Sequence, residues 1–359
     1  MKPPYKVPSM KEIAEIPWNG YNVVSTFSGG GGSCLGYRMA GYRVLYANEF
    51  VDEAQRTYKA NHPKSHLDPR DIRRVTADDI RAIIGNAEID IFDGSPPCAA
   101  FSTAGLKHKG WGKVKDYSDT RQRVDDLFFE YTRLLRDLQP KVFVAENVSG
   151  LIKGTAKGYF KLIIKELKEC GYNVSVKLLN GKWLGIPQAR ERLIFIGVRN
   201  DLSISPVHPK PLPYYYTVSD ALKGLDIDRE ERIMLLNTFK RTKMGEVLRK
   251  IEKNPKKPIT GQRVTGGSYF NLRRESMYQA CGTITATGGT GAGNCHPIED
   301  RPFTIGEVKR LCSFPDDFIL TGNRSQQWER AGRSVPPIMM MRVAKTIEEE
   351  VLNKIGTNI

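Results

Sequence analysis

The stretch VVSTFSGGGGS, residues 23–33, joins an apolar run to four consecutive glycines. A strand that enters a glycine-rich turn and then a helix brings its backbone close to a ligand, because glycine has no side chain to block the approach. The helix start favours an anionic group at that place. Glu49 follows the next apolar run, 20 residues after Gly29, where a carboxylate is suited to bind ribose hydroxyls. The stretch alone predicts a nucleotide-like cofactor, and a tight turn that merely needs glycine is the alternative.

A nicotinamide-dependent dehydrogenase would use the same layout of strand, turn and helix. Its fingerprint Gly-x-Gly-x-x-Gly fails here, because Cys34 stands at the position of the last glycine. That class of oxidoreductase also leaves the cysteine motif at residues 96–98 without a role. It is therefore disfavoured.

Short apolar runs alternate with helix-like segments on both sides of the glycine-rich stretch. This alternation predicts an α/β fold with a doubly wound, mostly parallel sheet of the Rossmann-like type. In such sheets the ligands lie beyond the carboxyl ends of the strands. The expected strands cover residues 21–26, 43–47, 89–93, 142–145, 174–179 and 193–198, and the expected helices 52–61, 125–138 and 158–170.

The character of the sequence changes after about residue 200. Four prolines between 206 and 213 lead into three tyrosines, a basic stretch follows over 227–264, and 283–293 is rich in glycine and threonine. These features predict a second, smaller and irregular domain over 201–324. Residues 1–200 and 325–359 then form the catalytic domain, with a returning helix over 337–355.

Composition limits the class of protein. Lysine and arginine number 55 against 40 aspartates and glutamates, which gives a net charge of +15. This excess suits a polyanionic partner such as nucleic acid, although many basic proteins bind none. No apolar run approaches the ~20 residues that cross a bilayer, and the first residues lack a signal core. We expect a cytoplasmic, nucleoid-associated protein with no membrane partner. The six cysteines form no CxxC pair, which argues against a metal site and a disulfide framework.

Three further motifs carry chemistry. Cys98 follows two prolines just past an apolar run, which suits a nucleophile on a rigid loop, whereas a purely structural cysteine is the alternative. Glu146 ends another apolar run and suits a general acid, or a salt bridge at a strand end. Arg190 and Arg192 stand two apart at the start of a strand, where we expect them to share one face and hold a phosphate or a carbonyl oxygen. A solvated charge run is the alternative for the two arginines.

Taken in order, these motifs resemble those of the cytosine-C5 DNA methyltransferases of bacteria and phages. Pro-Pro-Cys, Glu-Asn-Val and Gln-x-Arg-x-Arg carry the resemblance at these separations. It implies S-adenosylmethionine as the donor, double-stranded DNA as the substrate, a flipped target cytosine, and a target-recognition domain. The matching positions are 27–32, 49, 71–72, 94–98, 146–148, 188–192, 301–315 and 332–337.

The resemblance implies a role for each catalytic residue. The Cys98 thiolate adds to C6 of cytosine, which makes C5 nucleophilic. Glu146 protonates or hydrogen-bonds N3 and the exocyclic amine, Arg192 holds O2, and Arg190 belongs to the same catalytic group. The sequence identifies no base for removal of the C5 proton.

The resemblance also implies the donor site and the DNA-contacting segments. Phe27 lies against the adenine, Glu49 takes the ribose, Asp71 takes the adenine amine, and glycines 29, 31 and 32 admit the methionine end. The remaining expected donor contacts are Ser28, Ile72, Pro97, Arg333 and Ser334. A loop over 99–119 closes over the base, and segments 240–257 and 283–294 contact DNA.

Two positions depart from the family pattern. Ser25 stands where the family usually has an acid, and Arg333 replaces the Asn of Gly-Asn-Ser-Val. Three interpretations of Arg333 remain open: it faces solvent or phosphate in an ordinary methyltransferase, it leaves a weakly active DNA-binding relic, or it pairs with the carboxylate of carboxy-S-adenosylmethionine so that a carboxymethyl group is transferred. A non-catalytic DNA-binding protein is the other class. We expect a monomer, and the sequence leaves open whether a cognate restriction endonuclease is a partner.

Overall fold

The computed structural model describes residues 2–97, 115–117, 120–122, 127–152, 156–290 and 293–355. They fall into two compact units, each built from separate segments of the chain. The sheet unit comprises Ile16–Leu179, Glu191–Pro209 and Met340–Ile359. The loop-rich unit comprises Met1–Glu15, Asn180–Arg190 and Lys210–Met339. The functional division into 1–200 plus 325–359 and 201–324 stays a prediction.

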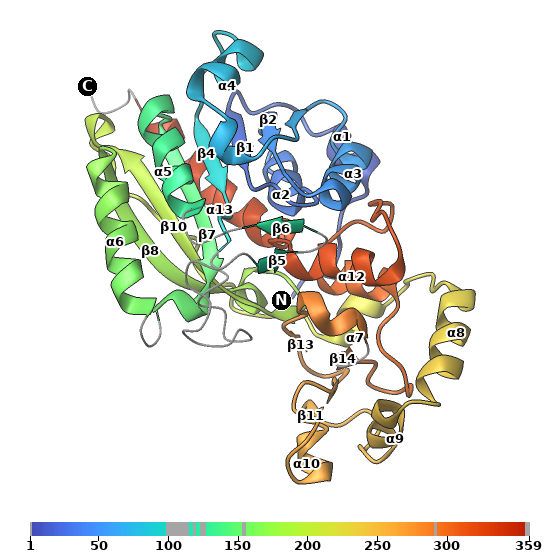
Figure 1. The fold of residues 1–359 in the computed structure, drawn as a ribbon. Coiled ribbons are helices and arrows are strands. Elements are labelled where there is room, and N and C mark those ends of the chain that lie inside the picture. Colours follow the sequence, from blue (N-terminus) through green and yellow to red (C-terminus); the bar gives the residue numbers. More distant parts are fainter. Residues whose placement is uncertain are drawn as a thin grey trace. The chain divides into compact units, whose positions relative to one another are not determined.

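A seven-stranded sheet in the order β3-β2-β1-β4-β7-β10-β8 forms the centre of the sheet unit (Figure 1). The first five strands in this order run parallel to their neighbours, and β10 runs antiparallel to β7. The predicted doubly wound, mostly parallel sheet is therefore confirmed. The strands are β1 (Asn22–Thr26), β2 (Arg43–Asn48), β3 (His66–Asp68), β4 (Ile91–Gly94), β7 (Val142–Val148), β8 (Tyr172–Asn180) and β10 (Glu191–Arg199).

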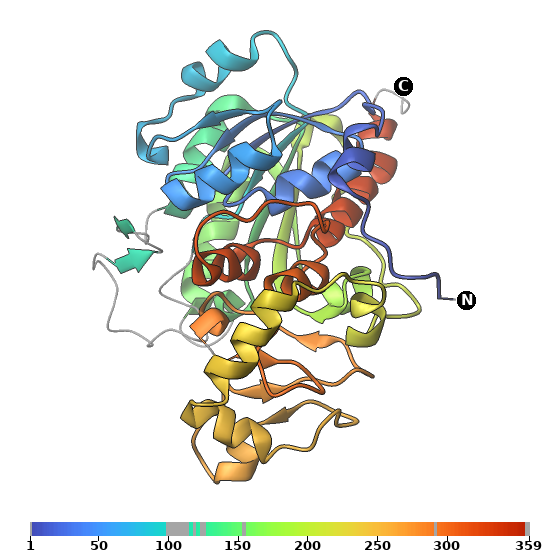
Figure 2. The ribbon, with the colours of Figure 1, turned by 90° about the vertical axis from the view of Figure 1, so that its right-hand side faces the viewer.

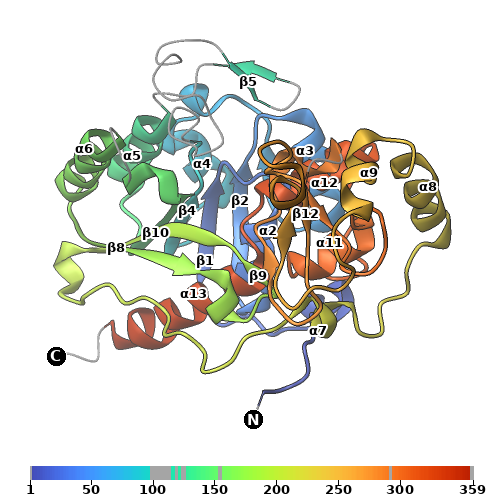
Figure 3. The same cartoon turned by 90° about the horizontal axis from the view of Figure 1, so that it is seen from below.

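Helices cover both faces of this sheet. On one face α4, α5 and α6 pack against a core of buried aromatic and aliphatic side chains from the strands, and α2, α3 and the later part of α13 lie on the other (Figures 1 and 3). Figure 2 shows the blue helices α2 and α3 together on their side of the sheet. The bounds are α2 (Gly32–Met39), α3 (Asp52–Asn61), α4 (Ala77–Ile84), α5 (Leu127–Leu138), α6 (Ala156–Glu169) and α13 (Pro337–Glu350), with 3-10 turns η1 (Ile72–Arg74), η2 (Ser149–Ile152), η4 (Asn200–Leu202) and η6 (Leu352–Lys354).

Local sequence explains where these helices begin. Asp52 and Glu53 occupy the first turn of α3, where their charges complement the helix dipole. Thr76 caps α4 and forms a capping box with Asp79. Helix 52–61 was predicted with its observed bounds, whereas β3 and α4 were not predicted. The strand β3 has only three residues, too few for a periodic signal.

The loop-rich unit contains short elements. Its largest sheet has three strands in the order β11-β12-β14, and β13 pairs with β9. The strands are β9 (Gln188–Ala189), β11 (Ile259–Thr260), β12 (Arg273–Arg274), β13 (Cys281–Gly282) and β14 (Asn294–Cys295). The helices are α1 (Met10–Ala14), α7 (Val218–Leu222), α8 (Arg229–Phe239), α9 (Lys243–Arg249), α10 (Gln262–Thr265), α11 (Ile305–Leu311) and α12 (Arg324–Arg333), with η3 (Gly181–Leu184) and η5 (Ala286–Thr290). In the sheet unit, a separate antiparallel pair, β5 (Lys115–Tyr117) and β6 (Thr120–Gln122), completes the described strands.

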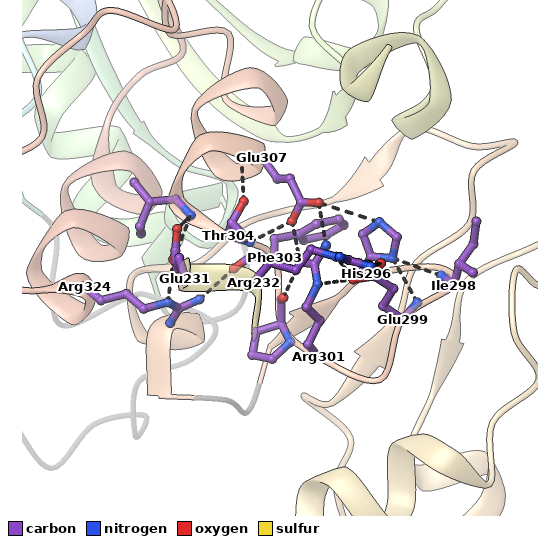
Figure 4. A network of polar contacts seen from close by, with 12 residues as sticks. Glu231, Arg232, His296, Ile298, Glu299, Arg301, Phe303, Thr304, Glu307 and Arg324 are labelled. Atoms are coloured by element: carbon purple, nitrogen blue, oxygen red, sulfur yellow. Dashed lines mark hydrogen bonds and ion pairs between the residues drawn. The ribbon is translucent and has the colours of Figure 1, made fainter. Parts of the chain in front are cut away.

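A buried network of charges stabilises the loop-rich unit around the start of α11 (Figure 4). The Arg301 guanidinium donates to both carboxylate oxygens of Glu307, at 2.7 and 2.8 Å. His296 Nδ1 accepts from the backbone amides of Ile298 and Glu299, at 3.2 and 3.0 Å, and burial lowers the pKa of His296 to about 4. The histidine is therefore neutral at pH 7, and its accepting nitrogen helps to fix the turn before α11.

Within the described ranges, no helix is both long and apolar enough to cross a membrane.

Candidate active site

The glycine-rich turn lies between β1 and α2 and has an unusual backbone. Phe27, Gly29 and Gly31 have φ values of +52, +55 and +89°, in the region that favours glycine. Ser28 N donates to Asn48 O at 3.0 Å, which ties the turn to β2. A bulky residue held at positive φ is strained, and such strain gathers at ligand sites. The Phe27 conformation is thus a structural sign of function at this turn.

The two glycines with positive φ differ in their surroundings. A Cβ at Gly31 would lie 2.2 Å from His62 Nε2, whereas a Cβ at Gly29 would meet no atom within 4 Å. Gly31 is also the N-cap of α2 and has no side chain to accept from the first amides of the helix. The turn therefore leaves open space in front of Gly29 and leaves the start of α2 suited to an anionic group.

Glu49 lies at the end of β2 and reaches the glycine-rich turn. Gly29 N donates to its Oε2 and Val51 N to its Oε1, each at 2.7 Å. Two backbone amides thus fix the carboxylate beside the turn. Because each carboxylate oxygen has a further lone pair, the same group can accept hydrogen bonds from hydroxyls.

Asp93 on β4 is a buried carboxylate that the sequence analysis missed. Its Oδ2 accepts from Ser25 Oγ at 3.0 Å and from Ser33 Oγ at 2.9 Å, and its Oδ1 accepts from Tyr37 OH at 3.1 Å. Ser25 and Asp93 are register partners on the parallel strands β1 and β4. Burial raises the pKa of Asp93 to about 6, and the hydroxyl donors oppose that rise.

The contacts of Asp93 tie the strand before the glycine-rich turn to the helix after it. Ser25 is the position at which the family usually has an acid, and the register partner of Ser25 carries one here. The available signal was an aspartate at the end of the expected strand 89–93, the last of two aspartates in it.

Glu146 and Arg192 form an ion pair in the sheet unit. Arg192 Nε lies 2.5 Å from Glu146 Oε1, and both side chains are largely buried. On the antiparallel strands β7 and β10, Glu146 lies opposite Ile194. Since side chains two residues apart share a face of a strand, Arg192 comes to lie diagonally across from Glu146.

Asn147, next to Glu146, holds the segment that leads to the cysteine motif. Its Nδ2 donates to the carbonyl of Pro96 at 3.2 Å. Pro97 follows β4, outside any helix or strand, and is half-buried. Cys98 lies outside the described residues. Asn147 is thus a positioning residue for the backbone that precedes the predicted nucleophile, and the sequence analysis missed this role.

A model of the C-5 cytosine-specific DNA methylase family matches residues 21–349. The chain belongs to the C-5 cytosine-specific DNA methylase family.

Individual relatives extend this finding. The methylase is 40% identical over 360 residues to the type II methyltransferase M.FnuDI of Fusobacterium nucleatum, which covers 92% of this chain and 95% of the relative. It is 32% identical over 352 residues to the type II methyltransferase M.PspPI of Psychrobacter sp. (strain TA137), with 94% and 81% covered. A solved structure of a DNA modification methyltransferase encoded within an E. coli prophage has the same fold, with a TM-score of 0.72, 23% identity, and 92% of this chain and 99% of that chain covered.

The protein is therefore an enzyme that methylates C5 of cytosine in DNA, and S-adenosylmethionine is the methyl donor that its family implies. Several expected donor contacts of the methylase have other partners as well. Ile72 is buried in the core cluster that Phe27 packs against. Asp71 caps η1 by accepting from Arg73 N and also pairs with the Arg73 guanidinium at 3.1 Å. Ser28 Oγ donates to Ser25 Oγ at 3.0 Å.

Arg190 and Arg192 of the methylase have different partners, although we expected them to share one face. Arg190 is buried in the loop-rich unit, where its guanidinium donates to the carbonyls of Ile284 at 3.0 Å and Gly332 at 2.8 Å. The physical reason is that Arg190 falls at the break between β9 and β10, so the alternation of a single strand does not apply to it. In this unit Arg190 holds the backbone at the end of α12.

Arg333 and Ser334 lie at that same end of α12. Arg333 Nε donates to Glu329 Oε1 at 2.6 Å, one helical turn away. Ser334 Oγ donates to the carbonyl of Arg330 at 2.7 Å. The charge that departs from the family pattern therefore has a carboxylate partner within its own helix.

Proposed function

We propose that the sheet unit binds S-adenosylmethionine at the glycine-rich turn and uses Cys98, Glu146 and Arg192 to methylate a flipped cytosine in double-stranded DNA. The observation that carries this proposal is the Glu146–Arg192 ion pair, with its 2.5 Å contact. An acid and a forked cation held together suit the N3 and O2 edge of cytosine, because that edge gains negative charge when C6 is attacked.

The described residues fit the donor. The open space in front of Gly29 and the uncapped start of α2 suit the methionine carboxylate. Glu49 is oriented by Gly29 N and Val51 N and suits the ribose hydroxyls. When bound, S-adenosylmethionine supplies an electrophilic methyl group, which the activated C5 takes up. In this proposal Phe27, Ser28, Gly31, Gly32, Asp71, Ile72 and Pro97 complete the donor site, Ser28 through its backbone.

The chain's own groups carry the remaining chemistry. The Cys98 sulfur forms a bond to C6, and the C5–C6 electron pair makes C5 nucleophilic while Glu146 supplies a proton or hydrogen bond at N3. Arg192 holds O2 as its charge grows. After C5 is substituted, loss of its proton restores the C5–C6 double bond and expels the Cys98 thiolate. Asn147 assists by holding the Pro96 backbone, and Arg190 by holding the Gly332 backbone.

The pairing of Arg333 with Glu329 supports the ordinary donor over carboxy-S-adenosylmethionine. Glu329 gives the Arg333 guanidinium a carboxylate partner within α12, so the presence of this charge is explained without a carboxylate on the donor. We further propose that the enzyme is a monomer that acts on nucleoid DNA and protects it from a cognate restriction endonuclease. The printed names of the relatives, type II methyltransferases, support this last part.

Mass spectrometry of nucleosides from DNA of expressing cells tests the function. We expect 5-methylcytosine with the natural chain, none with Cys98→Ala, and an unchanged amount with Cys170→Ala, a matched cysteine away from the motif. Retained 5-methylcytosine in Cys98→Ala would overturn the nucleophile. A carboxymethyl adduct that disappears in Arg333→Asn would overturn the choice of donor.

A further inference from the structure

Asp93 is a buried carboxylate without a cationic partner. It has 2% of its surface exposed, and Ser25, Ser33 and Tyr37 donate to it through neutral hydroxyls. Within the parts of the chain that the structure describes, no lysine, arginine or histidine forms an ion pair with Asp93. A buried charge is costly unless an opposite charge compensates it. The hydroxyl dipoles stabilise the carboxylate, but they leave its net charge in place.

A second aspartate of the same segment shows the usual compensation. Asp90, which directly precedes β4, also has 2% of its surface exposed. The Lys141 ammonium donates to its Oδ1 at 2.8 Å, and the backbone amide of Asn22 donates to its Oδ2 at 2.7 Å. Asp90 and Asp93 are therefore equally buried, and they differ in whether a cation balances the charge.

The uncompensated charge of Asp93 lies among the elements that form the glycine-rich turn. Ser25 lies on β1 before the turn, and its hydroxyl accepts from the hydroxyl of Ser28 within the turn at 3.0 Å. Ser33 lies in the first turn of α2, directly after the glycines. Asp93 thus contacts both sides of the turn at which the proposed function places the methionine end of the donor.

Methyl transfer changes the charge of the ligand at this end. S-adenosylmethionine has a sulfonium cation, whereas S-adenosylhomocysteine has a neutral sulfur, because the electron pair of the broken S–CH3 bond stays on the sulfur. The adenosine, amino and carboxyl groups are the same in both ligands. A buried negative charge nearby attracts the sulfonium and gains little from the neutral sulfur.

We propose that Asp93 sets the preference of the methylase for its charged donor over the neutral product, through an unpaired negative charge beside the glycine-rich turn. The proposal rests on the proposed function in so far as it requires the donor to bind at this turn. The sulfonium then supplies the positive charge that the chain does not place at Asp93. Loss of that positive charge on methyl transfer weakens the attraction and favours release of the product.

Calorimetric titration of the full-length protein with S-adenosylmethionine and, separately, with S-adenosylhomocysteine tests the proposal. At pH 8 Asp93 is ionised, because its pKa is about 6. Asp93→Asn and Asp93→Ser remove the charge and still offer an oxygen to the neighbouring hydroxyls. Asp90→Asn is the matched control, since it removes a buried carboxylate whose charge Lys141 already balances.

With Asp93→Asn, we expect the Kd of S-adenosylmethionine to rise roughly 10-fold and the Kd of S-adenosylhomocysteine to change by less than about twofold. Asp93→Ser should give the same result, and it replaces Asp93→Asn if that variant does not fold. Asp90→Asn should leave the ratio of the two Kd values unchanged. Equal changes in both Kd values with Asp93→Asn, as a purely structural role would give, or no change in either, would overturn the proposal.

Moving the charge gives a second test. Ser25 and Asp93 are register partners on β1 and β4, so the double variant Ser25→Asp with Asp93→Ser transfers the carboxylate across one strand pair. We expect this variant to regain the natural ratio of the two Kd values. A folded double variant with the ratio of Asp93→Ser would contradict an effect of charge. Failure of the natural protein to bind either ligand would instead overturn the proposed donor site, on which this inference rests.

Discussion

At the scale of single residues, the planar guanidinium of Arg192 is the group that we expect to contribute most to catalysis after the nucleophile. Its Nε lies 2.5 Å from Glu146 Oε1, and its Nη1 donates to the carbonyl of Glu191 at 2.8 Å, which leaves Nη2 to hold O2. We predict that Arg192→Lys lowers kcat/KM for DNA roughly 100-fold, because an ammonium keeps the charge but cannot bind both partners in one plane. Steady-state transfer of labelled methyl groups measures this.

Arg199→Lys is the matched control for Arg192→Lys. Arg199 lies at the other end of β10 and pairs with Asp201. The Arg199→Lys variant should have a kcat/KM within about twofold of the natural value, as expected for a change in a surface ion pair. Equal rates for Arg192→Lys and the natural enzyme would contradict the role of the fork.

The raised pKa of Asp93 leads to a second prediction at this scale, on how stability depends on pH. Its pKa in the folded protein is about 6, above the unfolded value of about 3.9. The folded state therefore binds more protons than the unfolded state between pH 4 and 6, so this group lowers stability as pH rises through that window. We predict that Asp93→Asn removes this contribution, so that its free energy of unfolding relative to the natural protein rises by about 2 kcal/mol between pH 4.5 and 7.5. Urea unfolding at several pH values measures the difference, and a pH-independent difference would contradict it.

At the scale of elements, two glycines of the turn between β1 and α2 can be compared. Gly31→Ala combines a φ of +89° with a clash against His62, and we expect a loss of about 2 to 4 kcal/mol in stability. Gly29→Ala has the positive φ but open space, and we expect a loss of about 1 kcal/mol. Calorimetric titration with S-adenosylmethionine should also show weaker binding for both.

Gly158→Ala is the control for the turn glycines. Gly158 lies within α6, where a Cβ would meet nothing within 4 Å. Although Gly158 lies in the first turn of α6, alanine is the better helix former, and the substitution should raise stability by up to about 1 kcal/mol. If all three substitutions changed the melting temperature equally, the special geometry of the turn would be refuted.

Sequence periodicity predicted the elements of the sheet unit better than it predicted the contacts of the site. Local patterns of apolar residues predicted helix 52–61 and the main strands, and the structure contains these elements. The hydrogen bond from Ser25 to Asp93 depends instead on the register of β1 against β4, which joins residues 68 positions apart. The separation of Arg190 from Arg192 has a similar cause, because it depends on the break between β9 and β10.

At the scale of the whole molecule, the net charge of +15 predicts a strong dependence on salt. Each phosphate contact releases counterions, so a protein that contacts four or more phosphates loses roughly a hundredfold in DNA affinity between 50 and 200 mM salt. We expect at least this loss for duplex binding. Filter binding measures it, and a nearly flat salt response would contradict a phosphate-dominated interface. The affinity for S-adenosylmethionine, measured in the same buffers, should change by less than about tenfold, since the donor adds few charges.

The interleaving of the two units has a consequence for the exchange of sequence specificity between relatives. The loop-rich unit takes a short insert, Asn180–Arg190, from between two strands of the sheet unit. Within that insert, Arg190 holds carbonyls of the long segment at Ile284 and Gly332. A graft that replaced only residues 210–339 would keep Arg190 of the recipient but replace the two backbone carbonyls to which it donates. We expect such a graft to transfer sequence specificity when both proteins have this arginine and place the two carbonyls at the same positions. A recognition segment can therefore be exchanged only between relatives that share these contacts.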